Sequence, residues 1–297
     1  MKRLSVIIVT YKSEGDIYDC LRSLWQYNDI AADELEVIVV DNSPSCEPMF
    51  SKLSALYGER IVLVHNTHNG GYGQGNNVGI RMAKSPVVLV MNPDVRLIQP
   101  IFRTAISAFE NDPNLCMYGM KQMLSEHVKS PLSFDCSCHM CGYLAPVLAT
   151  IANRLDAYSP RSMFFAGSCF FVDKQKFLSI GLFDEDIFMY GEEDDIHWRF
   201  KHNYGARFCY NPQLRYVHCT LQRKLSLDTE KKIVESLILS HSKKGVERTT
   251  TIANRIRYYR VRYYSARLKL FLGKADREHV RVLSELLDYL KSYSAKC

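Results

Sequence analysis

Residues 69–77 read Asn69-Gly70-Gly71-Tyr72-Gly73-Gln74-Gly75-Asn76-Asn77 and lie between two short apolar runs, residues 61–65 and 87–91. Glycines let a backbone approach a ligand closely, and a helix expected over residues 76–84 would direct its N-terminus at that ligand. The stretch has neither the glycine spacing of a dinucleotide fingerprint nor the Gly-Lys-Ser/Thr of a P-loop. Taken alone, it fits either a ligand-binding loop or a tight loop that enters a helix.

Outward from this stretch, short apolar runs alternate with segments of helical spacing. Strands are predicted at residues 4–9, 36–40, 61–65 and 87–91, and helices at 17–25, 48–57, 76–84 and 100–111. This alternation is typical of an α/β fold with a mostly parallel central sheet flanked by helices. The pattern weakens over residues 120–161, where we expect a long variable loop or a small subdomain. It returns as a strand-like run at 164–172 and a helix at 194–202.

The composition excludes several classes of protein. Apolar residues make up 47% of the 297 residues and charged residues 24%, so the chain is not disordered. No apolar run reaches the roughly 18–20 residues of a membrane-spanning helix. The N-terminal segment also lacks the apolar core of a signal peptide, so we expect a cytoplasmic protein with reduced cysteines.

The net charge of +6 is unevenly distributed. Residues 221–297 hold 18 Lys and Arg against 8 Asp and Glu, whereas residues 1–220 hold 20 against 24. The sequence therefore predicts a helical, basic C-terminal region with an anionic partner. Its interleaved arginines and tyrosines at 255–264 suit an anionic bilayer interface, but also nucleic acid or a solvated helix face.

Polar side chains follow the predicted strands at their carboxyl ends, where ligands bind in an open parallel sheet. They are Thr10-Tyr11, Asp41-Asn42 and Asn92-Pro93-Asp94. An aspartate in this position can hold a divalent ion or bind the edge of a nucleobase. For a single aspartate, a helix N-cap or an Asx turn is the more common role.

Four consecutive acids, Glu192-Glu193-Asp194-Asp195, lie at the start of the helix predicted at 194–202. Their mutual repulsion raises some of their pKa values, which suits a general base. Acids also stabilise the start of a helix. That simpler role leaves the upstream Phe183-Asp184-Glu185 unexplained.

In this order, the motifs resemble those of an inverting glycosyltransferase of family 2 with the GT-A nucleotide-sugar-binding fold. Among its members, the chain is most similar to rhamnosyltransferase-like enzymes that build bacterial surface polysaccharides. The resemblance covers residues 4–220 and is carried by residues 6–11, 40–43, 69–79, Asn92-Pro93-Asp94 and Glu192-Glu193-x-Asp195-x-x-x-Arg199. The downstream Asn211-Pro212 and His218 also fit. It implies a GT-A domain at 1–220, an acceptor-side region at 120–165 and a C-terminal helical basic region at 221–297.

The resemblance also implies roles for individual residues. Glu193 would be the catalytic base, and Asp94 and His218 would bind Mg²⁺ or Mn²⁺. The donor, a UDP- or dTDP-sugar, would be bound by Thr10, Tyr11, Asp41, Asn69, Gly71, Gly75, Asn76 and Asn92. Glu192, Asp195, Gly167 and Ser168 would bind the acceptor or support the base. The acceptor would be a saccharide, linked to a polyprenyl diphosphate, at the inner face of the plasma membrane, with no nucleic acid expected.

Two positions depart from the family pattern. Asn92 stands where the metal motif usually begins with an aspartate, and Glu193 stands where the base is commonly an aspartate. Asparagine offers a carbonyl oxygen without charge, so metal binding would depend more on Asp94 and His218. The longer Glu193 side chain also leaves Glu192 and Asp195 open as alternatives for the base.

The chemistry of inverting transfer matches this set of residues, because it needs one base and a cation but no covalent nucleophile. Two rival functions stay open. One is a sugar-phosphate nucleotidyltransferase, and the other is a non-catalytic scaffold with a degenerate transferase site. A zinc site in Cys136-x-Cys138-His139-x-Cys141 is disfavoured against a thiol-rich loop, since no second ligand pair follows at finger spacing.

Overall fold

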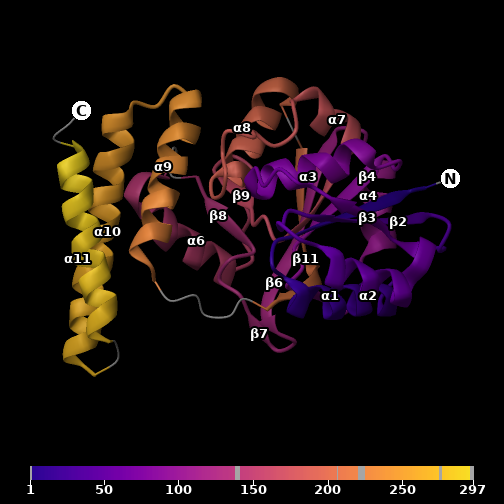
Figure 1. Cartoon of the computed structure of the whole chain (residues 1–297). Helices are drawn as coiled ribbons and strands as arrows, with labels where there is room; N and C mark the ends of the chain where they lie inside the picture. Colours follow the sequence, from indigo (N-terminus) through magenta and orange to yellow (C-terminus); the bar gives the residue numbers. More distant parts are fainter. Residues whose placement is uncertain (1, 138–140, 206, 220–224, 274–275, 295–297) are drawn as a thin grey trace.

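The computed structural model describes residues 2–137, 141–205, 207–219, 225–273 and 276–294. Within these residues the chain forms a nine-stranded sheet, a separate two-stranded sheet and helices that flank both (Figure 1). None of the described helices is both long enough and apolar enough to span a bilayer.

The large sheet has the strand order β3-β2-β1-β4-β10-β6-β11-β5, with β7 paired to β6. Its strands are β1 (Leu4–Thr10), β2 (Leu35–Asp41), β3 (Val62–His65), β4 (Val87–Met91), β5 (Val95–Leu97), β6 (Leu115–Ser125), β7 (Val128–Lys129), β10 (Cys169–Asp173) and β11 (Arg207–His218). The four strands β3-β2-β1-β4 are parallel, as predicted. The other half is mixed, because β10 runs antiparallel to both β4 and β6 and β5 runs antiparallel to β11.

Two apolar clusters cover the two faces of the sheet. Alternate residues of β1 contribute to each, with Val6 and Ile8 in one cluster and Ile7 in the other. The helices of this part are α1 (Glu14–Gln26), α2 (Glu47–Tyr57), α3 (Gly71–Met82), α4 (Phe102–Asn111), α7 (Lys174–Ser179) and α8 (Glu192–Tyr204), with a 3₁₀ turn η1 (Gly58–Arg60). The predicted α/β class is therefore confirmed.

The glycine-rich stretch differs from the predicted loop, because α3 already begins at Gly71. The glycines allow this helix to lie very close to its neighbours. A Cβ at Gly75 would lie 2.8 Å from Cγ1 of Val9, and one at Gly79 would lie 2.5 Å from Cγ2 of Ile7. The glycines thus serve helix-to-sheet packing.

The strand-like run at 164–172 is divided between two sheets. β9 (Met163–Phe165) pairs with β8 (Phe134–Cys136) in the small sheet, whereas β10 belongs to the large one. The turn between β9 and β10 holds Gly167 and Ser168. Together with η2 (Gly142–Leu144) and α6 (Ala145–Arg154), β8 and β9 make the region around 120–161 a small subdomain, one of the two predicted alternatives.

The chain ends in three helices, α9 (Leu227–Lys243), α10 (Arg248–Phe271) and α11 (Arg277–Ser294). They lie side by side, with α6 and β8 between them and the large sheet (Figure 1). Their own apolar core includes Val234, Tyr259 and Leu286. The helical C-terminal region is confirmed, while the domain boundary predicted at 220–221 falls outside the described residues, as do Cys138 and His139 of the cysteine cluster.

Candidate active site

A cavity of about 580 Å³ gathers residues from parts of the chain that extend from Tyr72 to Arg255. Of the residues predicted from the sequence, it is lined by Asn92, Gly167, Ser168, Glu192, Glu193 and His218. The volume lies within the range of small-ligand sites. One cavity is thus lined by residues predicted as the base, as a metal ligand and as acceptor-binding residues, and they lie up to 126 positions apart in the sequence.

Glu193 lies in the first turn of α8, which begins after Gly191 in a left-handed backbone conformation with φ of 104°. Its carboxylate lies against the turn between β9 and β10, where a Cβ added to Gly167 would be 2.0 Å from Oε1 of Glu193. Burial raises the pKa of Glu193 to about 7, and the charges of Asp194 and Asp135 add to the rise, whereas backbone hydrogen bonds oppose it. A carboxyl group with this pKa is suited to accept a proton near neutral pH.

Glu192 and Asp195 have different environments. Glu192 is 3% exposed, and burial followed by the charge of Glu193 raises its pKa well above the usual range. Its Oε2 has no hydrogen-bond partner among the described residues. Asp195 is held by Arg199, whose Nε donates to Oδ2 at 2.8 Å, and does not line the cavity. Asp195 therefore stabilises α8, whereas Glu192 and Glu193 line the cavity, as do Asp194 and Asp135.

His197, which the sequence motifs did not single out, fixes this helix against the small sheet. Its Nδ1 lies 2.8 Å from the carbonyl oxygen of Glu193, and the backbone N–H of Phe165 donates to its Nε2 at 3.2 Å. Burial lowers the pKa of His197 to about 3, so the ring stays neutral and donates through Nδ1. His197 positions Glu193 and does not act as a base.

The predicted metal ligands are brought together by the pairing of β5 with β11. Oδ1 of Asp94 lies 3.1 Å from Nε2 of His218, although the two residues are 124 positions apart in the sequence. The backbone of Asn92 is fixed beside them, where its N–H donates to the carbonyl of Ser168 at 2.8 Å. A carboxylate, an imidazole and an amide oxygen are donor groups that fit Mn²⁺ or Mg²⁺.

The predicted nucleobase residue Asp41 is buried in a hydrogen-bond network at the end of β2. Its Oδ1 accepts from Oγ1 of Thr10 at 2.7 Å and from Oγ of Ser43 at 3.0 Å. It also lines a cavity of about 380 Å³ together with Lys12 and Cys46. Tyr11 is exposed at the end of β1. The network holds Asp41 so that its remaining lone pairs can face a ligand.

Other predicted donor residues make contacts within the protein. Asn69 accepts from the N–H of Gly71 through Oδ1, and Asn76 donates to the carbonyl of Tyr72 at 2.9 Å. Gly71 has a φ of 94°, and a Cβ there would lie 2.0 Å from the carbonyl oxygen of Phe188. Within this stretch, Tyr72 lines the cavity that holds Glu193, and its hydroxyl donates to the carbonyl of Gly167.

The C-terminal helices contribute residues that sequence reasoning missed. Ile233 and Leu237 of α9 and Arg255 of α10 line the same cavity as Glu193. Lys244, just after α9, forms a buried ion pair with Asp194, with 2.6 Å between Nζ and Oδ2. The sequence indicated only a basic tail, and no motif predicted that this tail would contact the acids of α8.

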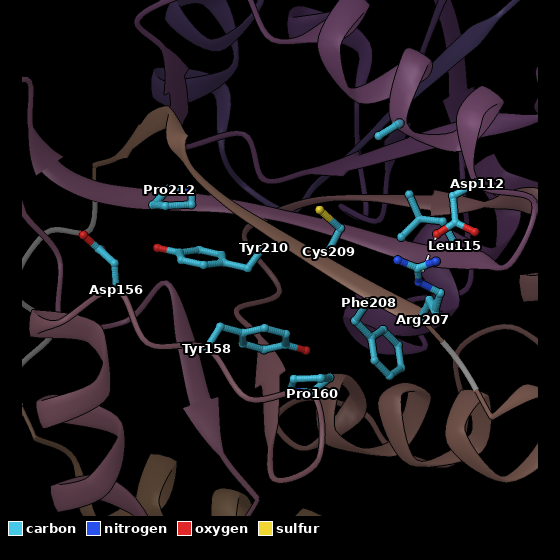
Figure 2. A pocket seen from close by; sticks show the side chains of 11 residues that line it. Asp112, Leu115, Asp156, Tyr158, Pro160, Arg207, Phe208, Cys209, Tyr210 and Pro212 are labelled. Atoms are coloured by element: carbon cyan, nitrogen blue, oxygen red, sulfur yellow. Dashed lines mark ion pairs between the residues drawn. The ribbon is translucent and has the colours of Figure 1, made fainter.

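Another cavity, of about 470 Å³, lies along β11 and is lined by Tyr158, Tyr210 and an ion pair between Arg207 and Asp112 (Figure 2). It contains none of the residues predicted for the site. It also lacks the paired acids and the carboxylate–imidazole pair. The cavity that holds Glu193 is therefore the candidate active site.

Comparisons with known proteins bear on the family and the fold of the chain. Residues 5–127 match the model of the family described as Glycosyl transferase family 2. The chain is 30% identical over 203 residues to the low-salt glycan biosynthesis hexosyltransferase Agl10 of Haloferax volcanii, covering 66% of this chain and 61% of that protein. It is 26% identical over 256 residues to the uncharacterized glycosyltransferase YfnE of Bacillus subtilis, covering 73% and 64%. The matches thus span slightly under two thirds of the length of these relatives.

The fold is also found in solved structures. A mannosyltransferase from Pyrobaculum calidifontis, PcManGT, in complex with GDP-Man and Mn²⁺, is similar with a TM-score of 0.62 and 17% identity, covering 99% of this chain and 86% of that one. Residues 1–349 of S. aureus TarS in complex with UDP-GlcNAc are similar with a TM-score of 0.56 and 16% identity, covering 97% and 80%. At this level of identity these structures establish the fold alone. The family match over residues 5–127 and the two curated relatives support a glycosyltransferase of family 2, and the solved structures share its fold.

Proposed function

We propose that the chain is a metal-dependent inverting glycosyltransferase. It would move a hexosyl or rhamnosyl group from a nucleotide-diphosphate sugar to a saccharide acceptor in surface polysaccharide synthesis. The observation that carries the proposal is the placement of Glu193. A carboxyl group whose pKa is raised to about 7 lines the same cavity as His218, which pairs with Asp94.

In this reaction the acceptor hydroxyl oxygen forms a bond to the anomeric carbon while the bond from that carbon to the diphosphate oxygen breaks. Glu193 takes the proton of the hydroxyl, an effect typically worth about 10²–10⁴-fold in rate. The electron pair of the broken bond leaves with the nucleoside diphosphate. Asp94 and His218 would hold Mg²⁺ or Mn²⁺, which neutralises charge on the diphosphate. Glu192 is buried beside Glu193, and burial followed by the charge of Glu193 raises the pKa of Glu192.

For the donor we propose a UDP- or dTDP-sugar bound at the ends of β1 and β2. Asp41 is held by Thr10 and Ser43 at the edge of a cavity, where its carboxylate can accept from the imide N–H of a pyrimidine. The similar structures were solved with different nucleotides, GDP-Man for PcManGT and UDP-GlcNAc for TarS. The choice of nucleotide therefore rests on Asp41 and is tested by a panel.

We further propose that the protein works at the inner face of the plasma membrane on a lipid-linked acceptor. Exposed apolar residues of α10, among them Leu268 and Phe271, lie near the exposed cations Arg267 and Lys269. Such a surface suits an anionic bilayer. Flotation with vesicles of phosphatidylcholine and phosphatidylglycerol tests this proposal, and protein that stays at the bottom of the gradient contradicts it.

A nucleotide-sugar panel tests the transferase function. Thermal shift and donor hydrolysis are measured with UDP-, dTDP- and GDP-sugars, each with Mn²⁺ and with EDTA. We expect one nucleotide class to stabilise the protein and to release nucleoside diphosphate slowly, with Mn²⁺ but not with EDTA. Release of diphosphate from a nucleoside triphosphate would instead identify a nucleotidyltransferase. Absence of any response would favour a binding scaffold.

A further inference from the structure

The C-terminal helices form one wall of the active-site cavity. Ile233 and Leu237 come from α9 and Arg255 from α10, and they line the cavity together with Glu193 of α8. In Figure 1, α9 lies beside α8 and β8, at the end of the molecule away from the N-terminal strands. Residues beyond the family match thus shape the space in which an acceptor would lie.

Polar contacts fix this wall in place. Oγ of Ser236 donates to the carbonyl of Met189 at 2.8 Å, in the segment that precedes α8. Nζ of Lys243 pairs with Oδ2 of Asp186 at 2.8 Å, and Nζ of Lys244 pairs with Asp194. The wall is therefore attached to the segment 184–194 that carries Glu193, and its side chains have defined positions relative to the base.

The lining of the cavity as a whole is mostly apolar. Leu132, Phe134, Phe164, Met189, Ile233 and Leu237 all line it. A saccharide alone presents hydroxyl groups that need hydrogen-bond partners. An apolar wall of this size suits a ligand that carries a hydrocarbon portion next to its sugar.

Arg255 brings a positive charge to the same wall. It is half-buried, and among the described residues it forms no ion pair. Its guanidinium lies 5.3 Å from the ring centroid of Tyr258. Asp135 lines the same cavity. Burial raises the pKa of Asp135 to about 6, and the charge of Arg255 partly opposes this rise. A partly buried guanidinium that forms no ion pair with a described residue is suited to bind a phosphate group, to which it can donate two parallel hydrogen bonds.

We infer that Arg255 recognises a phosphate or diphosphate ester whose apolar chain lies against Ile233 and Leu237. This inference deepens the proposed function, on which the assignment of this ligand as the acceptor rests. The sugar of such a ligand would extend from Arg255 toward Glu193, and its hydroxyl would meet the base. Arg255 is thus a specificity-determining residue supplied by the C-terminal helices.

Isothermal titration of the full chain with farnesyl diphosphate tests the inference. The titration is carried out in EDTA, because chelation removes any metal that could hold a diphosphate at Asp94 and His218. Inorganic diphosphate and farnesol are titrated in parallel to separate the charged group from the hydrocarbon. We expect farnesyl diphosphate to bind more tightly than either. Arg255→Gln should weaken its binding about 10- to 100-fold, the loss typical of hydrogen bonds to a charged group, and Arg255→Lys should recover part of it.

Arg257→Gln is the matched control, because Arg257 is an exposed arginine of the same helix that lies over the ring of Tyr143 and does not line the cavity. It should leave binding unchanged. Leu237→Ser should weaken binding of farnesyl diphosphate but not of inorganic diphosphate. Equal affinity of the wild type and Arg255→Gln for farnesyl diphosphate would overturn the inference, as would equal affinity of the wild type for farnesol and farnesyl diphosphate.

Titration of UDP and dTDP in Mn²⁺ separates this inference from the proposed function. Arg255→Gln should bind the nucleotide like the wild type, whereas Asp94→Asn should lose it. If no nucleotide binds but farnesyl diphosphate still depends on Arg255, the transferase proposal fails and the phosphate site stands. If nucleotide binds and Arg255→Gln changes nothing, the transferase proposal stands and the role of Arg255 is refuted.

Discussion

Lys244 and Asp194 form an ion pair that attaches the C-terminal helices to the helix carrying the candidate base. Nζ of Lys244 lies 2.6 Å from Oδ2 of Asp194, and the two side chains are 1% and 8% exposed. Burial alone would raise the pKa of Asp194, but the charge and hydrogen bond of Lys244 outweigh it and lower that pKa. The pair keeps a negative charge next to Glu193 and fixes one wall of the cavity.

Removing one partner of this pair should destabilise the protein strongly. Lys244→Met leaves Asp194 buried without its cation, and we expect a loss of about 3–5 kcal/mol in the free energy of unfolding, measured by urea denaturation. Lys243→Met is the matched neighbour, and its partly exposed pairs should contribute no more than about 1 kcal/mol. The double variant Lys244→Met with Asp194→Asn should recover part of the loss. A loss for Lys244→Met no larger than for Lys243→Met would show that the buried pair contributes little.

The buried carboxyl group of Glu192 should make stability depend on pH. The pKa of Glu192 is raised in the folded state. Above the pKa of about 4.3 that glutamate has in the unfolded chain, the unfolded chain has lost this proton while the folded protein still holds it. The free energy of unfolding therefore falls as pH rises above that value. Glu192→Gln is neutral at every pH. Its Tm should therefore exceed that of the wild type at pH 8 and lie close to it at pH 4.5.

Glu185 provides a control of opposite sign. Hydrogen bonds from Asn77, followed by those from Arg81, lower its pKa, so its contribution is present at pH 8 and is lost as pH falls. Glu185→Gln should lower Tm at pH 8 more than at pH 4. A Glu192→Gln variant that is less stable than the wild type at pH 8 would contradict the account of the buried acid.

A side chain at position 167, in place of Gly167, should lower turnover. A Cβ there would lie 2.0 Å from Oε1 and 2.8 Å from Cδ of Glu193, so Gly167→Ala must displace the carboxylate. We expect kcat to fall at least about 100-fold, since displacing a base by 1 Å can cost that much, while donor affinity measured by titration stays unchanged. Gly15→Ala is the control, because nothing lies within 4 Å of a Cβ at that position. Equal kcat for both variants would place the base elsewhere.

The rate of transfer should depend on the protonation of Glu193. Because its pKa is raised to about 7, kcat/KM should fall about tenfold per pH unit below that value and level off above it. The apparent pKa belongs to the interacting acids of α8 as a group. Asp135→Asn removes a charge that raises the pKa of Glu193, so the acidic limb should move to lower pH. A profile that is flat between pH 5 and 8 would exclude Glu193 as the base.

Much of the first half of the fold could be predicted from the sequence. The strands β1, β2 and β4 are continuous apolar runs, and such runs are buried on both faces of a parallel sheet whatever lies beside them. The start of α3 at Gly71 could not be predicted, because glycine disfavours a helix on its own and is accepted here only for its close contact with the sheet.

The sequence predicted candidate residues for the site but not the boundaries of the cavity that holds them. The order of motifs gave Glu193, Asp94 and His218 as candidates, and Oδ1 of Asp94 lies 3.1 Å from Nε2 of His218. The environments of Glu192 and Asp195 depend on burial and on Arg199, which no local pattern encodes. The contribution of Leu237, Lys244 and Arg255 depends on how the C-terminal helices dock, which is a tertiary property.

The measurement that tests the central claim most directly compares Glu193→Gln with the wild type in donor binding and in transfer. Glutamine keeps the size and polarity of the side chain but cannot accept the proton of the acceptor. We predict that Glu193→Gln binds the nucleotide-sugar in Mn²⁺ with the affinity of the wild type and loses at least about 100-fold of the transfer rate. Transfer at the wild-type rate by Glu193→Gln would contradict the assignment of the base and with it the proposed mechanism.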